Sequence, residues 1–173
     1  MEDKTNAQQR IKIACRDFRC NSHDTFYRPV YTPCRRKGVD CLLAVYRGIE
    51  GCKSQYPDLL SFWPHVLFSY CEDIGDDAFF DAVASQSLCE PLSVAAAMDR
   101  LSNQLGALLV PLSYELFEED TVIAGYLMFD ETDWFSLILQ TDSRYLAFFW
   151  ESHLQSRHEF LFSWWDTAVP EVP

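Results

Sequence analysis

The chain lacks any long uncharged apolar run. Its 173 residues contain no stretch of about 18 apolar side chains free of charge, which excludes an ordinary membrane-spanning helix. The first ten residues, MEDKTNAQQR, are polar and hold no apolar core of a signal peptide. We therefore expect one soluble, cytoplasmic domain over residues 1–173, with short disordered tails at 1–5 and 170–173.

The sequence also lacks a tight pair of metal-binding cysteines. Cys15, Cys20 and Cys34 lie near His23, but no C-x2-C pair occurs among the seven cysteines. An odd number of cysteines without a secretory signal is typical of free thiols packed as small apolar side chains. We expect no metal site and no cofactor.

Basic residues become rare after position 53. Residues 1–53 carry eleven Lys and Arg against six Asp and Glu, whereas residues 54–173 carry three against twenty. A net charge of −12 repels nucleic acid and attracts basic partners. The run RRK at 35–37 is too short for a nucleic-acid footprint, so we expect no nucleic-acid partner.

Turn-forming residues are missing from the C-terminal third. Residues 112–169 contain no proline, and no glycine follows Gly125. The segments DETD, QTDS and HLQSRH, where hairpin turns would fall, contain neither glycine nor asparagine. Apolar residues at three- and four-residue steps therefore favour a long helix over residues 144–165. High β-propensity in TVIAGYLMF and WFSLILQT leaves strands as the alternative.

Earlier segments show helical spacing of apolar residues with polar residues suited to capping the helix starts. Residues 21–38, which hold two prolines and a glycine, are expected to form a loop. We predict an all-α, single-domain helical bundle with a central hydrophobic hairpin and a surface groove. The alternative is an α+β fold in which N-terminal helices precede a C-terminal antiparallel meander. The predicted helices before residue 112 cover residues 6–19, 40–49, 58–71, 75–85 and 93–109.

Three phrases then stand in a meaningful order: CEDIGDDAFF at 71–80, YELFEEDTVIAGYLMF at 114–129 and FSWWDTAV at 162–169. Together they resemble the homology motifs of the B-cell lymphoma 2 (Bcl) family of apoptosis regulators. The sequence departs from the family where its Asn-Trp-Gly-Arg core reads Ile-Ala-Gly-Tyr, so the arginine that grips the ligand is Tyr126 here. Small size without a membrane anchor makes the chain similar to viral homologues.

The resemblance implies a non-enzymatic apoptosis inhibitor in the host cytosol. Its partner is an amphipathic helical segment of a pro-apoptotic protein, held in a hydrophobic groove. Gly125 is expected to let the ligand backbone approach closely. No catalytic residue is expected, and the oligomeric state is left open. The groove residues that the resemblance implies are Phe79, Phe80, Leu116, Val122, Gly125, Tyr126, Phe129 and Trp165.

Two other functions compete with this one. In GVDCLLAVYRG, Cys41 is expected at the start of a helix, where the dipole favours a thiolate. That placement suits a cysteine hydrolase of papain-like or ovarian-tumour-like type, with His153 or His158 as base. Small size, acidity and many aromatic residues also suit an immunity protein that neutralises a basic toxin domain.

Overall fold

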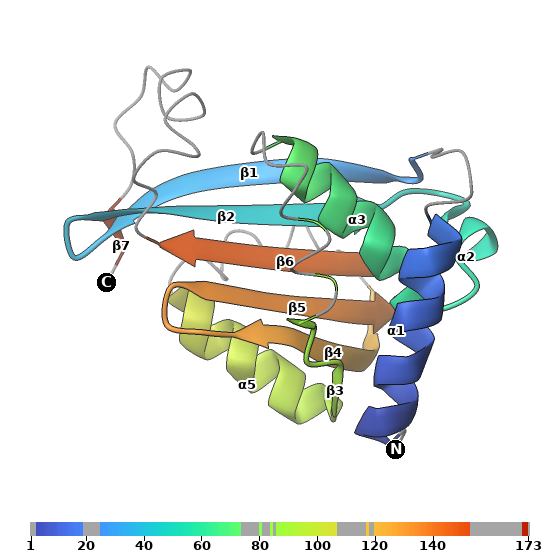
Figure 1. Cartoon of the computed structure of the whole chain (residues 1–173). Helices are drawn as coiled ribbons and strands as arrows, with labels where there is room; N and C mark the ends of the chain where they lie inside the picture. The colour runs from blue at the N-terminus through green and yellow to red at the C-terminus, as the bar shows by residue number, and fades with distance from the viewer. Residues whose placement is uncertain are drawn as a thin grey trace.

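A mainly antiparallel sheet with helices on both faces forms the body of the molecule (Figure 1). The computed structural model describes residues 3–18, 25–73, 80, 84, 86–106, 117, 120–152 and 171–172. The strand order is β3-β4-β5-β6-β2-β1-β7, and the short β1–β7 pair is the parallel one. The helices are α1 (Lys4–Phe18), α2 (Cys52–Gln55), α3 (Leu59–Asp73) and α5 (Val94–Leu105). The strands are β1 (Tyr27–Arg36), β2 (Val39–Gly48), β3 (Glu90–Leu92), β4 (Val122–Asp130), β5 (Trp134–Thr141), β6 (Tyr145–Ser152) and β7 (Glu171–Val172).

A hairpin of two ten-residue strands, β1 and β2, replaces most of the loop predicted at 21–38 and the helix predicted at 40–49. Its two-residue turn is Lys37-Gly38, and both residues have positive φ, 52° and 78°. Positive φ at both central residues is what a tight hairpin turn of the I′ class requires. Residues 41–46 are all buried, so other parts of the chain cover both faces of β2. A short run that is apolar on every side does not reveal its period, and this is why the helical prediction was wrong.

The backbone nitrogen atoms of the two prolines in β1 point away from β2. Counting from the two-residue turn, Pro29 and Pro33 fall at positions where neighbouring residues exchange no hydrogen bonds with β2. Their missing N–H groups therefore remove nothing from the β1–β2 ladder. In the sequence these prolines favoured a loop. They are compatible with a strand near the edge of the sheet.

The C-terminal strands β4, β5 and β6 form an antiparallel meander where a long helix was predicted. Tyr145 pairs with Gln140 and Trp134 with Glu151, so β6 lies against β5, and its other side pairs with β2. Residues 145–150 are all buried because both faces of this central strand are covered. The predicted all-α helical bundle is thus wrong. The alternative was right in its α+β class and its C-terminal meander, but it did not include the N-terminal hairpin β1–β2. Residues 153–165 of the predicted helix lie outside the described residues.

Side chains hold the β5–β6 turn in place of glycine or asparagine. The Arg144 backbone N–H donates to Thr141 Oγ1 at 2.9 Å, and the Thr141 N–H donates to the Arg144 carbonyl at 2.9 Å. Thr141 Oγ1 and Ser143 Oγ also donate to the Asp120 carboxylate, at 3.0 and 2.6 Å. Asp, Ser and Thr close turns by such side-chain bonds, so the missing glycine did not exclude a hairpin.

Three predicted helices are confirmed by α1, α3 and α5. Asp58 begins α3 by accepting the Ser61 N–H at 2.9 Å, while the Asp58 N–H donates to Ser61 Oγ at 3.1 Å. Ser93 caps α5 by accepting the Ala96 N–H at 3.2 Å. Most of the helix predicted at 75–85 lies outside the described residues. Within the described part of the chain, no helix has the length and apolar character needed to cross a membrane.

Each face of the sheet carries its own core. Helices α1 and α3 cover one face, where Trp63, Tyr70 and Phe149 pack together, and α5 covers the other face (Figure 1). Alternation along the strands divides the side chains, so Phe149 belongs to the first core and Phe148 to the second. The sheet is therefore the central layer of the molecule.

Candidate functional site: an arginine-lined pocket

The residues that the resemblance assigned to one groove fall into different places. Phe79, Leu116 and Trp165 lie outside the described residues. Phe80 is 5% exposed and packs its ring on Phe18 and Phe68, between α1 and α3. The remaining four, Val122, Gly125, Tyr126 and Phe129, lie on the strand β4.

Alternation along β4 sends its side chains to both faces of the sheet. Val122 packs on the α5 side, whereas Phe129 lies on the α1–α3 side, stacked on Trp134 with ring centroids 4.1 Å apart. Tyr126 packs against the same core as Phe129. The proposed groove required helices here, but the chain forms the strand β4. The four residues point to two faces of the sheet and do not line one wall.

Gly125 does permit a close approach, but within the chain itself. A Cβ atom placed there would lie 2.8 Å from Leu139 Cδ2 and 3.3 Å from Ala97 Cβ. Ala97 is a buried residue of α5. The glycine therefore lets α5 pack closely on β4. The close approach at Gly125 is made by this helix, where the resemblance had implied a ligand backbone.

Cys41 lies within β2 and not at a helix start. Its side chain is 1% exposed, so the helix-dipole basis for a cysteine nucleophile is wrong. His153 and His158, the candidate bases, lie outside the described residues. Among the described residues, no group of three or more His, Cys, Asp or Glu side chains is arranged to hold a metal ion.

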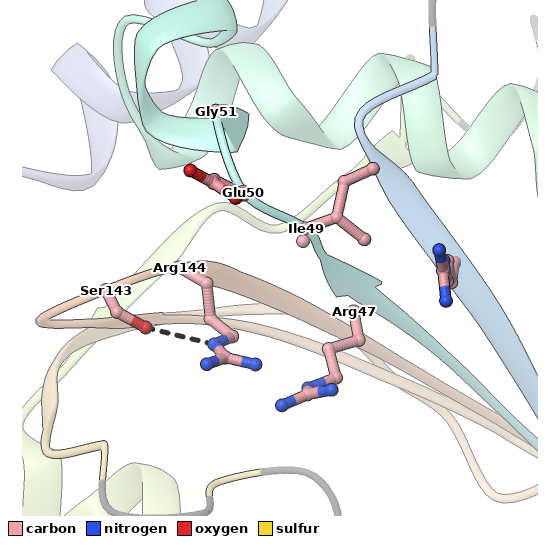
Figure 2. A pocket seen from close by; sticks show the side chains of 8 residues that line it. Arg47, Ile49, Glu50, Gly51, Ser143 and Arg144 are labelled. Carbon is pink, nitrogen blue, oxygen red and sulfur yellow. Dashed lines mark hydrogen bonds between the residues drawn. The ribbon is translucent and has the colours of Figure 1, made fainter.

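A polar pocket opens at the end of the sheet where β1 begins and β2 ends. Its volume is about 500 Å³, within the usual size of small-molecule sites. Figure 2 shows Arg47 and Arg144 extending their guanidinium groups to the same side, away from Glu50. The residues that line it are Arg28, Arg47, Gly48, Ile49, Glu50, Gly51, Ser143 and Arg144.

The β1–β2 register places Arg28 directly opposite Arg47. Like charges on directly opposed residues destabilise a sheet. Arg47 also pairs with Leu146, so Arg144, two residues earlier, is its diagonal neighbour. The Nε atom of Arg47 is buried, so part of this guanidinium lies inside the pocket wall. Three arginines from three segments thus line one pocket.

Asp120 fixes the position of Arg144. The guanidinium Nε of Arg144 lies 2.7 Å from the Asp120 carboxylate, and the side chains are 18% and 12% exposed. Partial burial alone raises the pKa of Asp120, but hydrogen bonds from Ser143 and Thr141 and the charge of Arg144 outweigh burial, so the net pKa lies below its ordinary value. The third arginine of the pocket is therefore held on a preorganised turn.

Replacing Asp120 with asparagine is expected to lower the free energy of unfolding by about 1.5–3 kcal/mol at pH 7, because charged hydrogen bonds to the turn are lost. A lowered folded-state pKa stabilises the fold above the unfolded value of about 3.9. That stabilisation disappears as the pH falls through the lower folded pKa. In urea unfolding, wild type and D120N should therefore differ at pH 7 and converge as the pH falls through the lowered folded-state pKa of Asp120.

Asp40→Asn is the matched control for D120N, because Asp40 forms an exposed ion pair with Arg35. We expect it to change the stability at pH 7 by less than about 1 kcal/mol. Equal effects of the two substitutions at pH 7 would contradict the role given to Asp120.

No family model matches this chain. No curated protein and no solved structure matches it either. The pocket must therefore be interpreted from its own geometry.

Sequence reasoning missed the arginine pocket because it missed the hairpin. Had Lys37-Gly38 been taken as a two-residue turn, counting outward nine residues on each side would have paired Arg28 with Arg47. Arg144 offered a second signal, since it is one of only three basic residues after position 53.

Proposed function

We propose that this chain is a binding protein whose arginine-lined pocket takes a small ligand bearing a phosphate or carboxylate group. The observation that carries the proposal is the directly opposed pair Arg28 and Arg47, with Arg144 diagonal to Arg47. An anion between these side chains offsets their mutual repulsion and favours an arrangement that is otherwise unfavourable.

Arginine suits this task for geometric reasons. Its planar guanidinium presents donors in a fixed fork that matches the oxygens of carboxylate and phosphate groups. Three such groups from β1, β2 and the β5–β6 turn can approach an anion from different sides. The cavity, at about 500 Å³, has room for an organic body attached to the anionic group.

Glu50 adds a preference to the same pocket. It is exposed on the loop between β2 and α2, and its carboxylate extends away from the arginines in Figure 2. A ligand with a cationic or hydroxyl group remote from its anionic end is expected to contact both charges. Zwitterions and hydroxylated phosphates or carboxylates are therefore added to the ligands to test.

Replacing Arg28 with glutamine is expected to weaken anion binding at least tenfold, about 1.4 kcal/mol, because one charge-assisted contact is lost. Isothermal titration calorimetry with inorganic phosphate, pyrophosphate and a panel of phosphomonoesters and dicarboxylates measures this effect. Arg35→Gln is the matched control, since it removes the same charge from the same strand outside the pocket. Equal loss in the two variants, or no binding to the wild type across the panel, would overturn the proposal.

A second function, neutralisation of a basic protein domain, is favoured by the β4–β5 turn. Asp130, Glu131 and Asp133 are exposed there, and Asp130 pairs with Arg100 at 2.8 Å. Carboxylates on a protruding turn steer basic partners to the surface. Replacing Glu131 and Asp133 with Lys is expected to lower the association rate for a toxin-type basic domain at least tenfold in low salt. An unchanged rate would count against this function.

A further inference from the structure

Two cysteines face each other across the β1–β2 hairpin. Cys34 of β1 is paired directly with Cys41 of β2, and their side chains are 0% and 1% exposed. Counting from the Lys37-Gly38 turn, the pair falls at a hydrogen-bonded position, where Cα atoms are about 5.5 Å apart. Disulfides typically span Cα separations of about 4.4–6.8 Å, so the register permits a bridge.

The local environment activates one of these thiols. The side-chain hydrogen bond with Cys34 lowers the pKa of the Cys41 thiol; burial opposes this, Arg36 adds to the lowering, and the net pKa lies below its ordinary value. Cys52 shows the opposite behaviour, because burial raises its pKa to about 11. The thiol of Cys41 is therefore more readily ionised than that of Cys52, and it is hydrogen-bonded to the sulfur of Cys34.

We propose that Cys34 and Cys41 form a site of reversible oxidation, in which hydrogen peroxide converts the two opposed thiols into a disulfide that ties β1 to β2. The inference is independent of the arginine pocket, because it concerns the turn end of the hairpin.

The chemistry balances with peroxide as the only oxidant. The Cys41 thiolate attacks one peroxide oxygen, the O–O bond breaks, and the leaving hydroxide takes up a proton to become water. Cys41 is then a sulfenic acid. The sulfur of Cys34 attacks the Cys41 sulfur, an S–S bond forms and the S–O bond breaks. The departing oxygen leaves as a second water, so two thiols lose two electrons and one peroxide gains them.

Access to the buried thiols comes from the adjacent turn. Lys37 and Gly38 are both exposed, and only two residue pairs separate Cys34 and Cys41 from them. Hairpin ends open locally at low cost in free energy, which is enough for a small oxidant to enter. Cys52 lies at the start of α2, and the raised pKa of its thiol leaves it the less reactive sulfur.

Peroxide treatment of the full chain, followed by unfolding, alkylation and mass spectrometry, tests the proposal. Trypsin cleaves at Arg35, Arg36 and Lys37, so a bridge would join peptide 38–47 to peptide 20–35. We expect this linked pair, a mass loss of two hydrogen atoms, and full recovery of both thiols on reduction. Cys52 should remain available to the alkylating reagent in the same sample.

Two variants assign the linkage. Cys34→Ala should abolish the linked peptides, although Cys20 remains in peptide 20–35, and Cys52→Ala should leave them unchanged. In the wild type, fragment ions that place the alkyl group on Cys20 of peptide 20–35 assign the bridge to Cys34, even where a variant fails to fold. Peroxide that leaves Cys34 and Cys41 reduced, oxidises them separately or joins either to another cysteine would overturn the proposal.

Discussion

Replacing Phe149 with alanine is expected to lower the free energy of unfolding by about 3–5 kcal/mol. Phe149 is fully buried at the centre of β6. Its ring stacks on Tyr70 at 4.4 Å and on Trp63 at 5.2 Å, and it meets the edge of Tyr46 at 5.6 Å. Truncation removes these contacts and leaves a cavity between the sheet and α3, which tightly held aromatic neighbours cannot readily fill.

Urea unfolding followed by circular dichroism measures this loss. Ile123→Ala is the control, because Ile123 is 50% exposed on β4 and should change stability by less than about 0.5 kcal/mol. A loss below about 1 kcal/mol for F149A would show that α3 does not pack on this face of the sheet as described.

Leu101→Ala tests the opposite face and is expected to cost about 2–5 kcal/mol. Leu101 is fully buried on α5, in the core that also contains Leu127 and Leu139 of the sheet. Removing most of its side chain opens a cavity under the helix that covers β4 and β5. The helix itself retains its cap at Ser93, so the loss arises from packing.

Ser102→Ala provides the matched control, since Ser102 is exposed on the next position of the same helix. Alanine there should be neutral or slightly stabilising, because alanine has the better helix propensity. Equal destabilisation by L101A and S102A would mean that helix formation, and not packing on the sheet, limits stability at α5.

The two large substitutions lie on opposite faces of one sheet, so their combined effect is informative. Phe149 and Leu101 belong to different cores. Substitutions without shared contacts normally add within about 0.5 kcal/mol. A double variant that unfolds with the sum of the two losses would support a sheet that separates two independent layers.

The helices were predictable because their signals are local. Ser93 caps α5 and Asp58 begins α3, and both residues act through atoms within three positions of themselves. The strands were harder to predict because β2 and β6 are buried on both faces and show no alternation. The turn at Thr141–Arg144 was hidden for another reason, since its stabilising partner is Asp120, some twenty residues earlier.

The pocket could be predicted only in part. The pairing of Arg28 with Arg47 follows from the Lys37-Gly38 turn once the hairpin is accepted. Arg144 depends on the contact of β6 with β2, which joins segments about a hundred residues apart. Motif resemblance gave no help here, because none of the described residues in its phrases lines the pocket. A site assembled by long-range strand pairing leaves little trace in any single stretch of sequence.

Backbone amide NMR during a phosphate and pyrophosphate titration tests the central claim most directly. If the arginine pocket binds the anionic group, the amides of Gly48, Gly51, Ser143 and Arg144 should shift in a saturable manner. The amides of the acidic turn at residues 130–133 should stay in place, and Arg28→Gln should suppress the shifts at the pocket. Saturable shifts confined to another surface, or none at any concentration, would contradict the assignment of this pocket as the functional site.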